Sequence, residues 1–231
     1  MNHLADSRQA AVQLPATWPW HAPVLATARV GAAFVPALDD VARLVKTLQG
    51  LVNEPVALER RSALRKHHKH VLLLTIVHQG LCTALRALRS PVALLRAVEQ
   101  SDRVRAKAGL PPVDEIFVGL ADKESFYNQR ARLVALPPVL IQQLRILQEH
   151  QIAMMVRLDR YEEWQSAPAR VRAMFRLDEN DRPVEVSVAW VEQELAELGF
   201  EWPANFARSF LRTRLLERGC AAADLDALLG H

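Results

Sequence analysis

The feature that most limits the possible folds is a stretch near residue 60 that is basic at first and then apolar. Residues 59–70 read ERRSALRKHHKH, with five Lys or Arg and three His against a single acid. Residues 71–77 read VLLLTIV, which should carry the same helix into a protein core. This apolar run is far too short to cross a bilayer. We therefore expect a globular protein with no membrane partner.

The composition favours helix. Half of the 231 residues are hydrophobic and only 8 are glycine, which fits a globular, mainly helical chain better than an all-β one. The formal charge of +3 permits a polyanionic partner without demanding one. No secretory signal is visible at the N-terminus, and Cys82 and Cys220 have no metal-ligand spacing. Reduced thiols in a cytoplasmic protein are the expectation.

Hydrophobic periodicity predicts both helices and short strands. Helical spacing is found from Asp39 to Asn53, over residues 139–162, and over residues 187–198, where Gly199 follows. Alternation predicts a β-hairpin from residues 116–120 and 132–136, and a second strand pair over 173–177 and 184–187. The predicted fold class is mainly α with a small antiparallel sheet (α+β). Residues 1–35, rich in Pro and Trp, are expected to form an irregular strap.

Three cations of the basic stretch share one helix face. Arg61, Arg65 and Lys69 recur at a spacing of four residues. Two interpretations stay open: a solvated helix face, or a surface that contacts DNA phosphates with a steep salt dependence. The neighbouring histidines lack acidic or cysteine partners nearby in the sequence, so no metal site is expected.

Two arginines stand out because of their surroundings. Arg86 follows directly on the apolar helix, so a partly buried start is expected for its side chain, which then needs a carboxylate or a bound phosphate as partner. Arg208 lies on the first of two short helices joined at Gly219. Asn205, three residues earlier, is a good N-cap for that helix.

Taken in order, these pieces resemble the catalytic domain of tyrosine recombinases, the phage-integrase family. Thr83-Ala-Leu-Arg86 resembles the first arginine box, usually T-G-x-R. Lys123, followed by the strand at residues 132–137, is similar to the hairpin lysine of the family. Asn205-Phe-Ala-Arg208 stands where H-x-x-R belongs, and Leu229-Gly-His231 stands where L-G-H belongs, 23 residues after Arg208. The resemblance covers roughly residues 65–231, so residues 36–231 are expected to form the integrase-like domain.

The resemblance implies DNA recombination or integration with double-stranded DNA as partner, no cofactor, and a homo-oligomer on DNA. In the family a tyrosine attacks a DNA phosphodiester and forms a 3′-phosphotyrosyl bond, which is later rejoined. Arg86 and Arg208 would neutralise the phosphate oxygens, and Lys123 would protonate the leaving oxygen. The position of Asn205 would assist proton transfer, and His231 would hydrogen-bond the phosphate.

This sequence departs from the family pattern in three places. Asn205 replaces a histidine, and an amide cannot exchange a proton near neutral pH. Ala84 replaces a glycine, and no tyrosine follows His231. Because neither Tyr127 nor Tyr161 takes the family position, strand cleavage by this chain is expected to be inactive. Two alternatives remain: a non-catalytic DNA-binding module that kept the fold, and a helical interaction protein, in which Arg86 and Arg208 would lie far apart.

Overall fold

The computed structural model describes residues 34–56, 60–120, 132–222 and 224–225 of the 231. All of them belong to one compact unit, Ala32–His231. The strap expected over residues 1–35, the tip of the first hairpin and the end of the chain therefore lie largely or wholly outside the described residues.

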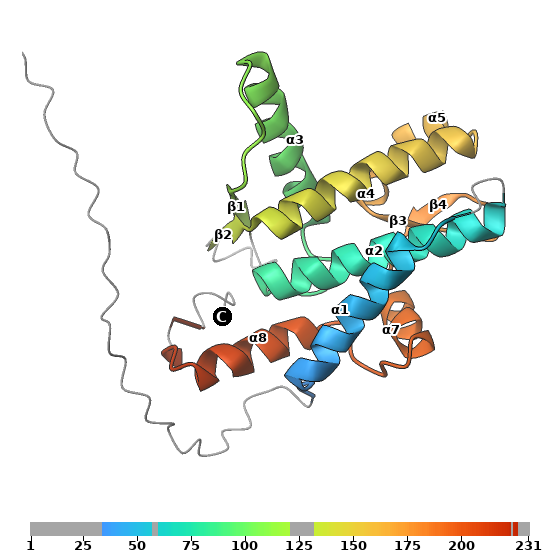
Figure 1. Cartoon of the computed structure of the whole chain (residues 1–231). Helices are drawn as coiled ribbons and strands as arrows, with labels where there is room; N and C mark the ends of the chain where they lie inside the picture. The colour runs from blue at the N-terminus through green and yellow to red at the C-terminus, as the bar shows by residue number, and fades with distance from the viewer. Residues whose placement is uncertain (1–33, 57–59, 121–131, 223, 226–231) are drawn as a thin grey trace, which may run out of the picture. The chain divides into compact units, whose positions relative to one another are not determined.

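The described part is mainly helical with two small antiparallel sheets, which confirms the α+β class (Figure 1). The helices are α1 (Leu38–Asn53), α2 (Arg61–Thr83), α3 (Pro91–Lys107), α4 (Pro138–Arg157), α5 (Tyr161–Gln165), α6 (Ala169–Ala173), α7 (Val188–Glu197) and α8 (Phe206–Glu217). The strands are β1 (Ile116–Leu120), β2 (Arg132–Leu136), β3 (Phe175–Leu177) and β4 (Pro183–Glu185).

Helix α2 is the central element, and it packs against α1, α4 and α8 (Figure 1). Its residues 71–80 are all buried, as the apolar run predicted. Its first turns carry the cations of the basic stretch and are largely exposed or half-buried. The apolar half of α2 is therefore covered on every side by other elements, whereas its charged half is partly open to solvent.

Strands β1 and β2 form the hairpin that the alternation predicted. Ile116 pairs with Leu136 and Leu120 with Arg132, in antiparallel register. Burial alternates along β1, because Ile116, Val118 and Leu120 face the core while Phe117 is 58% exposed. The hairpin tip, which holds Lys123, lies outside the described residues.

Two helix predictions need correction. The helix expected over residues 139–162 is interrupted after Arg157, because Asp159 adopts a left-handed conformation with φ 56°. The amides of Asp159 and Arg160 then bond back to the carbonyls of Val156 and Met155, a Schellman ending. Helix α3 was not predicted at all, although Ser90-Pro91 is a typical helix start.

Three hydrophobic clusters hold the described elements together. The first joins α1, α2, α7 and α8, and includes Leu44, Leu72, Leu195 and Phe206. The second joins α3, the first hairpin and the start of α4. The third joins the end of α4 to α5, α6 and β3. Together, the first and second clusters fix the loop between α2 and α3 beside the start of α8.

Within the described residues, no helix is both long enough and apolar enough to cross a membrane.

Candidate functional site

The loop after α2 lies against the start of α8. The guanidinium Nη1 of Arg208 donates a hydrogen bond to the carbonyl of Ala84, 3.1 Å away and 124 residues earlier in the chain. The backbone amide of Ala87 donates to the Oδ1 of Asn205 at 2.9 Å. Arg86 lies between these two bonded positions of the loop. The arginine boxes proposed from the sequence are therefore neighbours in space.

The loop has an unusual backbone. Ala84, Leu88 and Ser90 all have positive φ, at 54°, 61° and 54°, although none is glycine. Such left-handed residues cost free energy and gather at sites where the surrounding structure imposes them. Here Leu85 anchors the loop, since it is 1% exposed within the second cluster.

Side chains from the last turn of α2 hold the loop in place. The hydroxyl of Thr83 donates to the carbonyl of Gln79 at 2.6 Å and accepts from the amide of Leu85 at 3.2 Å. The amide nitrogen of Gln79 donates to the carbonyl of Arg89 at 2.8 Å. This role of Gln79 was not predicted from the sequence. A buried glutamine one turn before a loop is its only signal, and that signal is weak.

A close helix contact positions Arg208. A Cβ built on Gly80 would lie 2.8 Å from the Cβ of Ala207, closer than side-chain carbons approach in proteins. The two small residues let α2 and α8 touch near the loop. This role of Gly80 was not predicted from the sequence, although an isolated glycine inside an apolar helix is a recognised sign of close packing.

The two arginines differ in exposure. Arg208 is half-buried, and its guanidinium is oriented by the carbonyl of Ala84. Arg86 is exposed, so the prediction that its side chain extends from a partly buried position is wrong. The reason is that the chain turns at Ala84 and gives the inward position to Leu85.

Asn205 does not have the role expected from helix propensity. It stands at the N-cap position of α8, but its side chain makes no capping hydrogen bond. Its oxygen instead accepts from the amide of Ala87 across the contact. Asn205 therefore ties the Arg86 loop to α8. Lys123 and His231, the other proposed site residues, lie outside the described residues.

The cations of the basic face have carboxylate partners. Arg65 forms an ion pair with Asp181, whose side chain is 6% exposed, and Arg61 approaches the same carboxylate at 3.5 Å. Lys69 pairs with both Glu194 and Glu197. DNA contact by Arg61, Arg65 and Lys69 stays a prediction, and each cation would have to share its charge with these partners.

The pKa values around Lys69 follow from this pairing. Burial works against the charge on Lys69, but its hydrogen bonds to Glu194 and Glu197 outweigh that effect and raise its pKa. Burial raises the pKa of Glu194, whereas the hydrogen bond from Lys69 lowers that of Glu197. The arrangement keeps Lys69 charged and attached to α7.

The histidines of α2 belong to the interior. His68 is 1% exposed and its ring lies 5.3 Å from that of His150. Burial lowers the pKa of His68 to about 3 and that of His150 to about 4. In the part of the chain that the structure describes, no three His, Cys, Asp or Glu side chains form a group that could hold a metal.

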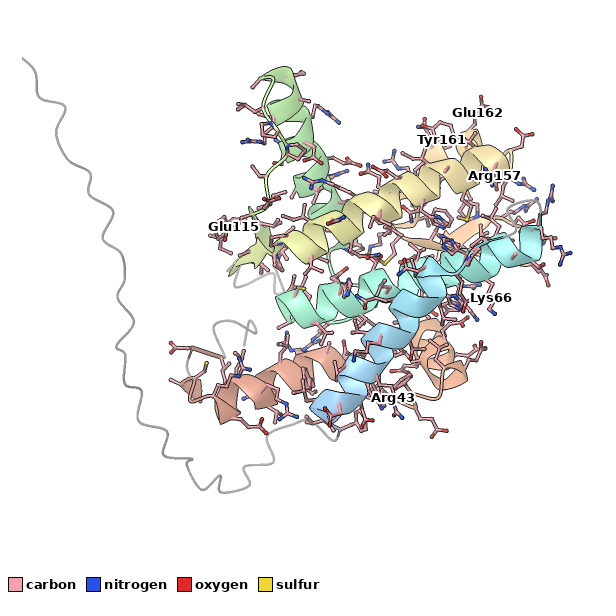
Figure 2. All side chains as sticks on the ribbon, in the orientation of Figure 1. Arg43, Lys66, Glu115, Arg157, Tyr161 and Glu162 are labelled. Atoms are coloured by element: carbon pink, nitrogen blue, oxygen red, sulfur yellow. The ribbon has the colours of Figure 1, made fainter. Side chains whose placement is uncertain are left out.

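Cys82 and Tyr161 are poor candidates for a nucleophile at the loop contact. Burial raises the pKa of Cys82 to about 11, which disfavours the reactive thiolate. Tyr161 begins α5, at the far end of α4 from the first hairpin (Figure 2), and its hydroxyl accepts a hydrogen bond from Gln165. Comparison with protein-family models found no matching family, and no curated protein shows significant similarity to this chain.

Proposed function

We propose that this chain is a DNA-recombination core of the tyrosine recombinase type, in which Arg86 and Arg208 hold one DNA phosphate. The supporting observation is the pair of hydrogen bonds that joins the Arg86 loop to α8, from Arg208 to Ala84 and from Ala87 to Asn205. These bonds join the loop after α2 to the start of α8, at the backbone positions from which both arginine side chains extend. The alternative of a helical interaction protein predicts instead that Arg86 and Arg208 lie far apart.

The chemistry of the pair suits a phosphodiester. Guanidinium groups are planar, permanently charged donors that match the non-bridging oxygens of a phosphate. Arg208 is pre-oriented by the carbonyl of Ala84, so little orientational freedom remains to be lost on binding. Arg86 is exposed and extends from a loop whose backbone is fixed by Thr83 and Gln79.

Strand cleavage is not expected from the residues described. Of the two tyrosines in the 231 residues, Tyr127 lies outside the described residues, and neither Tyr127 nor Tyr161 takes the sequence position of the family's nucleophile. We therefore propose DNA binding without a covalent 3′-phosphotyrosyl adduct for this chain. A denaturing gel of protein incubated with nicked duplex DNA should show no protein–DNA adduct, and a band that depends on Tyr161 would contradict this part of the proposal.

An alternative function is a non-catalytic DNA-binding module that kept the fold. The observation that favours it is Asn205, whose acceptor oxygen is used by the backbone amide of Ala87. A residue engaged in this way supports the architecture and takes no part in proton transfer. In this alternative the basic face of Arg61, Arg65 and Lys69 contacts DNA, and salt-dependent binding survives Arg208→Ala unchanged.

A double-mutant cycle separates the two functions. Arg86→Ala and Arg208→Ala are each expected to weaken duplex binding and to lower the salt slope by about one. If both arginines hold one phosphate, the double variant should lose less binding free energy than the sum of the two single losses. The reason is that removal of one arginine already disrupts the site, so removal of the other weakens binding less. Fluorescence anisotropy over a salt series measures both quantities.

The matched control is Arg157→Ala, on an exposed arginine at the C-terminal end of α4 (Figure 2). It removes the same charge without touching the loop contact. Equal losses of duplex-DNA affinity for Arg157→Ala and Arg86→Ala would mean that only the net charge of the protein matters. That result would contradict the proposal. Strictly additive losses for Arg86 and Arg208 would mean that they do not hold one phosphate, and unchanged binding by Arg208→Ala would favour the alternative.

A further inference from the structure

Helix α3 carries three exposed cations outside the proposed phosphate site. Arg96, Arg103 and Lys107 follow one another at intervals of seven and four residues, and all three are exposed. An α-helix turns by about 100° and rises by about 1.5 Å per residue, so the three side chains leave the helix within about 20° of one direction and extend over about 16 Å of its axis. These three residues form the α3 stripe.

The α3 stripe lies opposite the buried face of its helix. Leu94 and Val98 are buried in the second hydrophobic cluster, and both lie about half a turn around the helix from Arg96. The C-terminal end of α3 extends away from the other helices (Figure 1), and residues 106–112 are all exposed. A large partner can therefore reach the stripe.

The acids of α3 are used within the protein, whereas the stripe is not. Asp102 accepts two hydrogen bonds from the guanidinium of Arg145 on α4, at 2.8 and 2.7 Å. Glu99 accepts one from the side-chain amide of Gln148, also on α4. In the part of the chain that the structure describes, the side chains of the stripe have no ion-pair or hydrogen-bond partner. The cations of the basic face on α2, by contrast, are each matched by a carboxylate.

A straight row of unpaired cations suits a polyanion of high linear charge density. Duplex DNA carries one charge for about every 1.7 Å of its axis, so the stripe can lie against several phosphates at once. Helix α3 has no aromatic residue on which the bases of a single strand could stack. Its apolar residues Leu94, Leu95 and Val98 are buried, so they are not free to enter a membrane surface.

We propose that the α3 stripe contacts the phosphate backbone of duplex DNA. The inference rests on the DNA binding proposed above and adds a second contact to it. Helix α3 begins at Pro91, five residues after Arg86, and Lys107 lies about 24 Å further along its axis. The length of the stripe corresponds to about 5 base pairs at about 3.4 Å each, so the stripe lengthens the stretch of DNA that the protein contacts.

A triple variant tests the charge of the stripe. Arg96→Gln, Arg103→Gln and Lys107→Gln are combined, and fluorescence anisotropy measures binding of a labelled DNA duplex over a salt series. Each phosphate contact contributes about 0.9 to the salt slope, so the slope should fall by about 2 to 3. Affinity at low salt should fall at least about tenfold.

A matched triple variant removes the same charges from three other segments. Lys46→Gln on α1, Arg157→Gln on α4 and Arg182→Gln between β3 and β4 also remove one lysine and two arginines, all of them exposed. This variant should change the salt slope by less than about one. Thermal unfolding of both triple variants shows that they are folded. Equal losses of affinity in the two variants would mean that only net charge matters, and that result would overturn the proposal.

A crosslink tests the position of the DNA without changing any charge. Gln100 is exposed and lies between Arg96 and Arg103 on α3. A photo-reactive benzoylphenylalanine in place of Gln100 should form an adduct with the duplex on irradiation. The same replacement of Gln49, an exposed glutamine on α1, should not. No adduct at Gln100, or the same yield at both positions, would overturn the proposal.

The remaining outcomes separate this inference from the proposed function. If Arg86→Ala and Arg208→Ala weaken duplex binding but the stripe variant behaves like its matched control, the inference fails and the proposed phosphate site stands. If only the stripe variant loses affinity, the phosphate site fails and the stripe remains a DNA contact. No duplex binding by the parent chain would overturn both. Competition by polyglutamate as strong as that by duplex of equal charge would make the stripe a surface for acidic proteins, which would also overturn the inference.

Discussion

Gly80 and Ala207 set how closely α2 and α8 approach, because a Cβ on Gly80 would lie 2.8 Å from that of Ala207. Neither atom belongs to a flexible side chain, so the clash cannot be relieved by a change of rotamer. The contact lies one turn from the loop that carries Arg86 and one residue from Arg208. It therefore links helix packing to the geometry of the proposed phosphate site.

Gly80→Ala tests this link. Overpacking of a close contact costs about 1–3 kcal/mol of stability, and the helices must separate to admit the methyl group. We expect a lower free energy of unfolding in urea. We also expect a loss of duplex-DNA affinity, measured without urea at a temperature where the variant is still folded.

Gly50→Ala is the matched control for Gly80→Ala. Gly50 is exposed on α1, and a Cβ built on it meets nothing within 4 Å. Alanine is favoured over glycine in a helix by about 1 kcal/mol, so this variant should be more stable than the parent. If both substitutions stabilise the protein equally, α2 and α8 are not in the contact described.

Ala84→Gly tests the left-handed turn at the end of α2. Ala84 has φ 54° and ψ 20°, where glycine is less strained, but glycine also loses a buried methyl group. These effects nearly cancel, so we expect a change within about 0.5 kcal/mol. In the exposed interior of α4, Ala153→Gly should instead cost about 1 kcal/mol. Chemical denaturation of both variants measures the difference, and equal costs would contradict the left-handed turn.

Periodicity was sufficient for the elements whose apolar positions repeat regularly. Helix α2 has ten consecutive buried positions, and β1 alternates buried and exposed residues over its whole length. Ser187 accepts a hydrogen bond from the amide of Trp190 and thus caps α7, a position at which serine is a preferred residue. Helix α3 was missed because only Leu94, Leu95 and Val98 of its 17 residues are buried.

The structure brings together three of the residues that the resemblance singled out, but their hydrogen-bond partners were not predicted. The resemblance singled out Arg86, Asn205 and Arg208, and two hydrogen bonds bring their segments together. No local pattern could show that Asn205 bonds a backbone amide 118 residues away instead of capping its own helix. The partner of Arg65 is equally remote, since Asp181 lies 116 residues further on. Tertiary packing decides such contacts, and sequence spacing does not encode them.

Arg65→Gln tests whether the basic face is structural. The carboxylate of Asp181 is 6% exposed, and Arg61 approaches it only at 3.5 Å, so loss of Arg65 leaves a buried charge poorly paired. We expect a loss of about 1–3 kcal/mol in the free energy of unfolding. Arg170→Gln breaks an exposed pair with Glu185 and should cost about 0.5 kcal/mol or less.

The same variant addresses DNA binding. If Arg65 contacts a phosphate, Arg65→Gln should also lower the salt slope of duplex binding by about one. An unchanged slope together with lower stability would make Arg65 a structural residue. Unchanged stability with a lower slope would mean that its pairing with Asp181 contributes little to the fold.

His68 should make the protein sensitive to acid. Burial, reinforced by the nearby His150, lowers its pKa from 6.5 to about 3, so the folded protein keeps it neutral while the unfolded chain takes up a proton near pH 6.5. The stabilisation is therefore complete above pH 6.5 and is lost as the pH falls toward 3. From about pH 7.5 to about pH 5 this residue should contribute a loss of about 2 kcal/mol in the free energy of unfolding.

His68→Gln removes the titrating group and keeps an N–H donor for the carbonyl of Phe175, which His68 contacts at 2.8 Å. Urea unfolding at both pH values should show a smaller pH dependence for this variant than for the parent. An equal pH dependence in both proteins would mean that His68 is not the buried neutral group described.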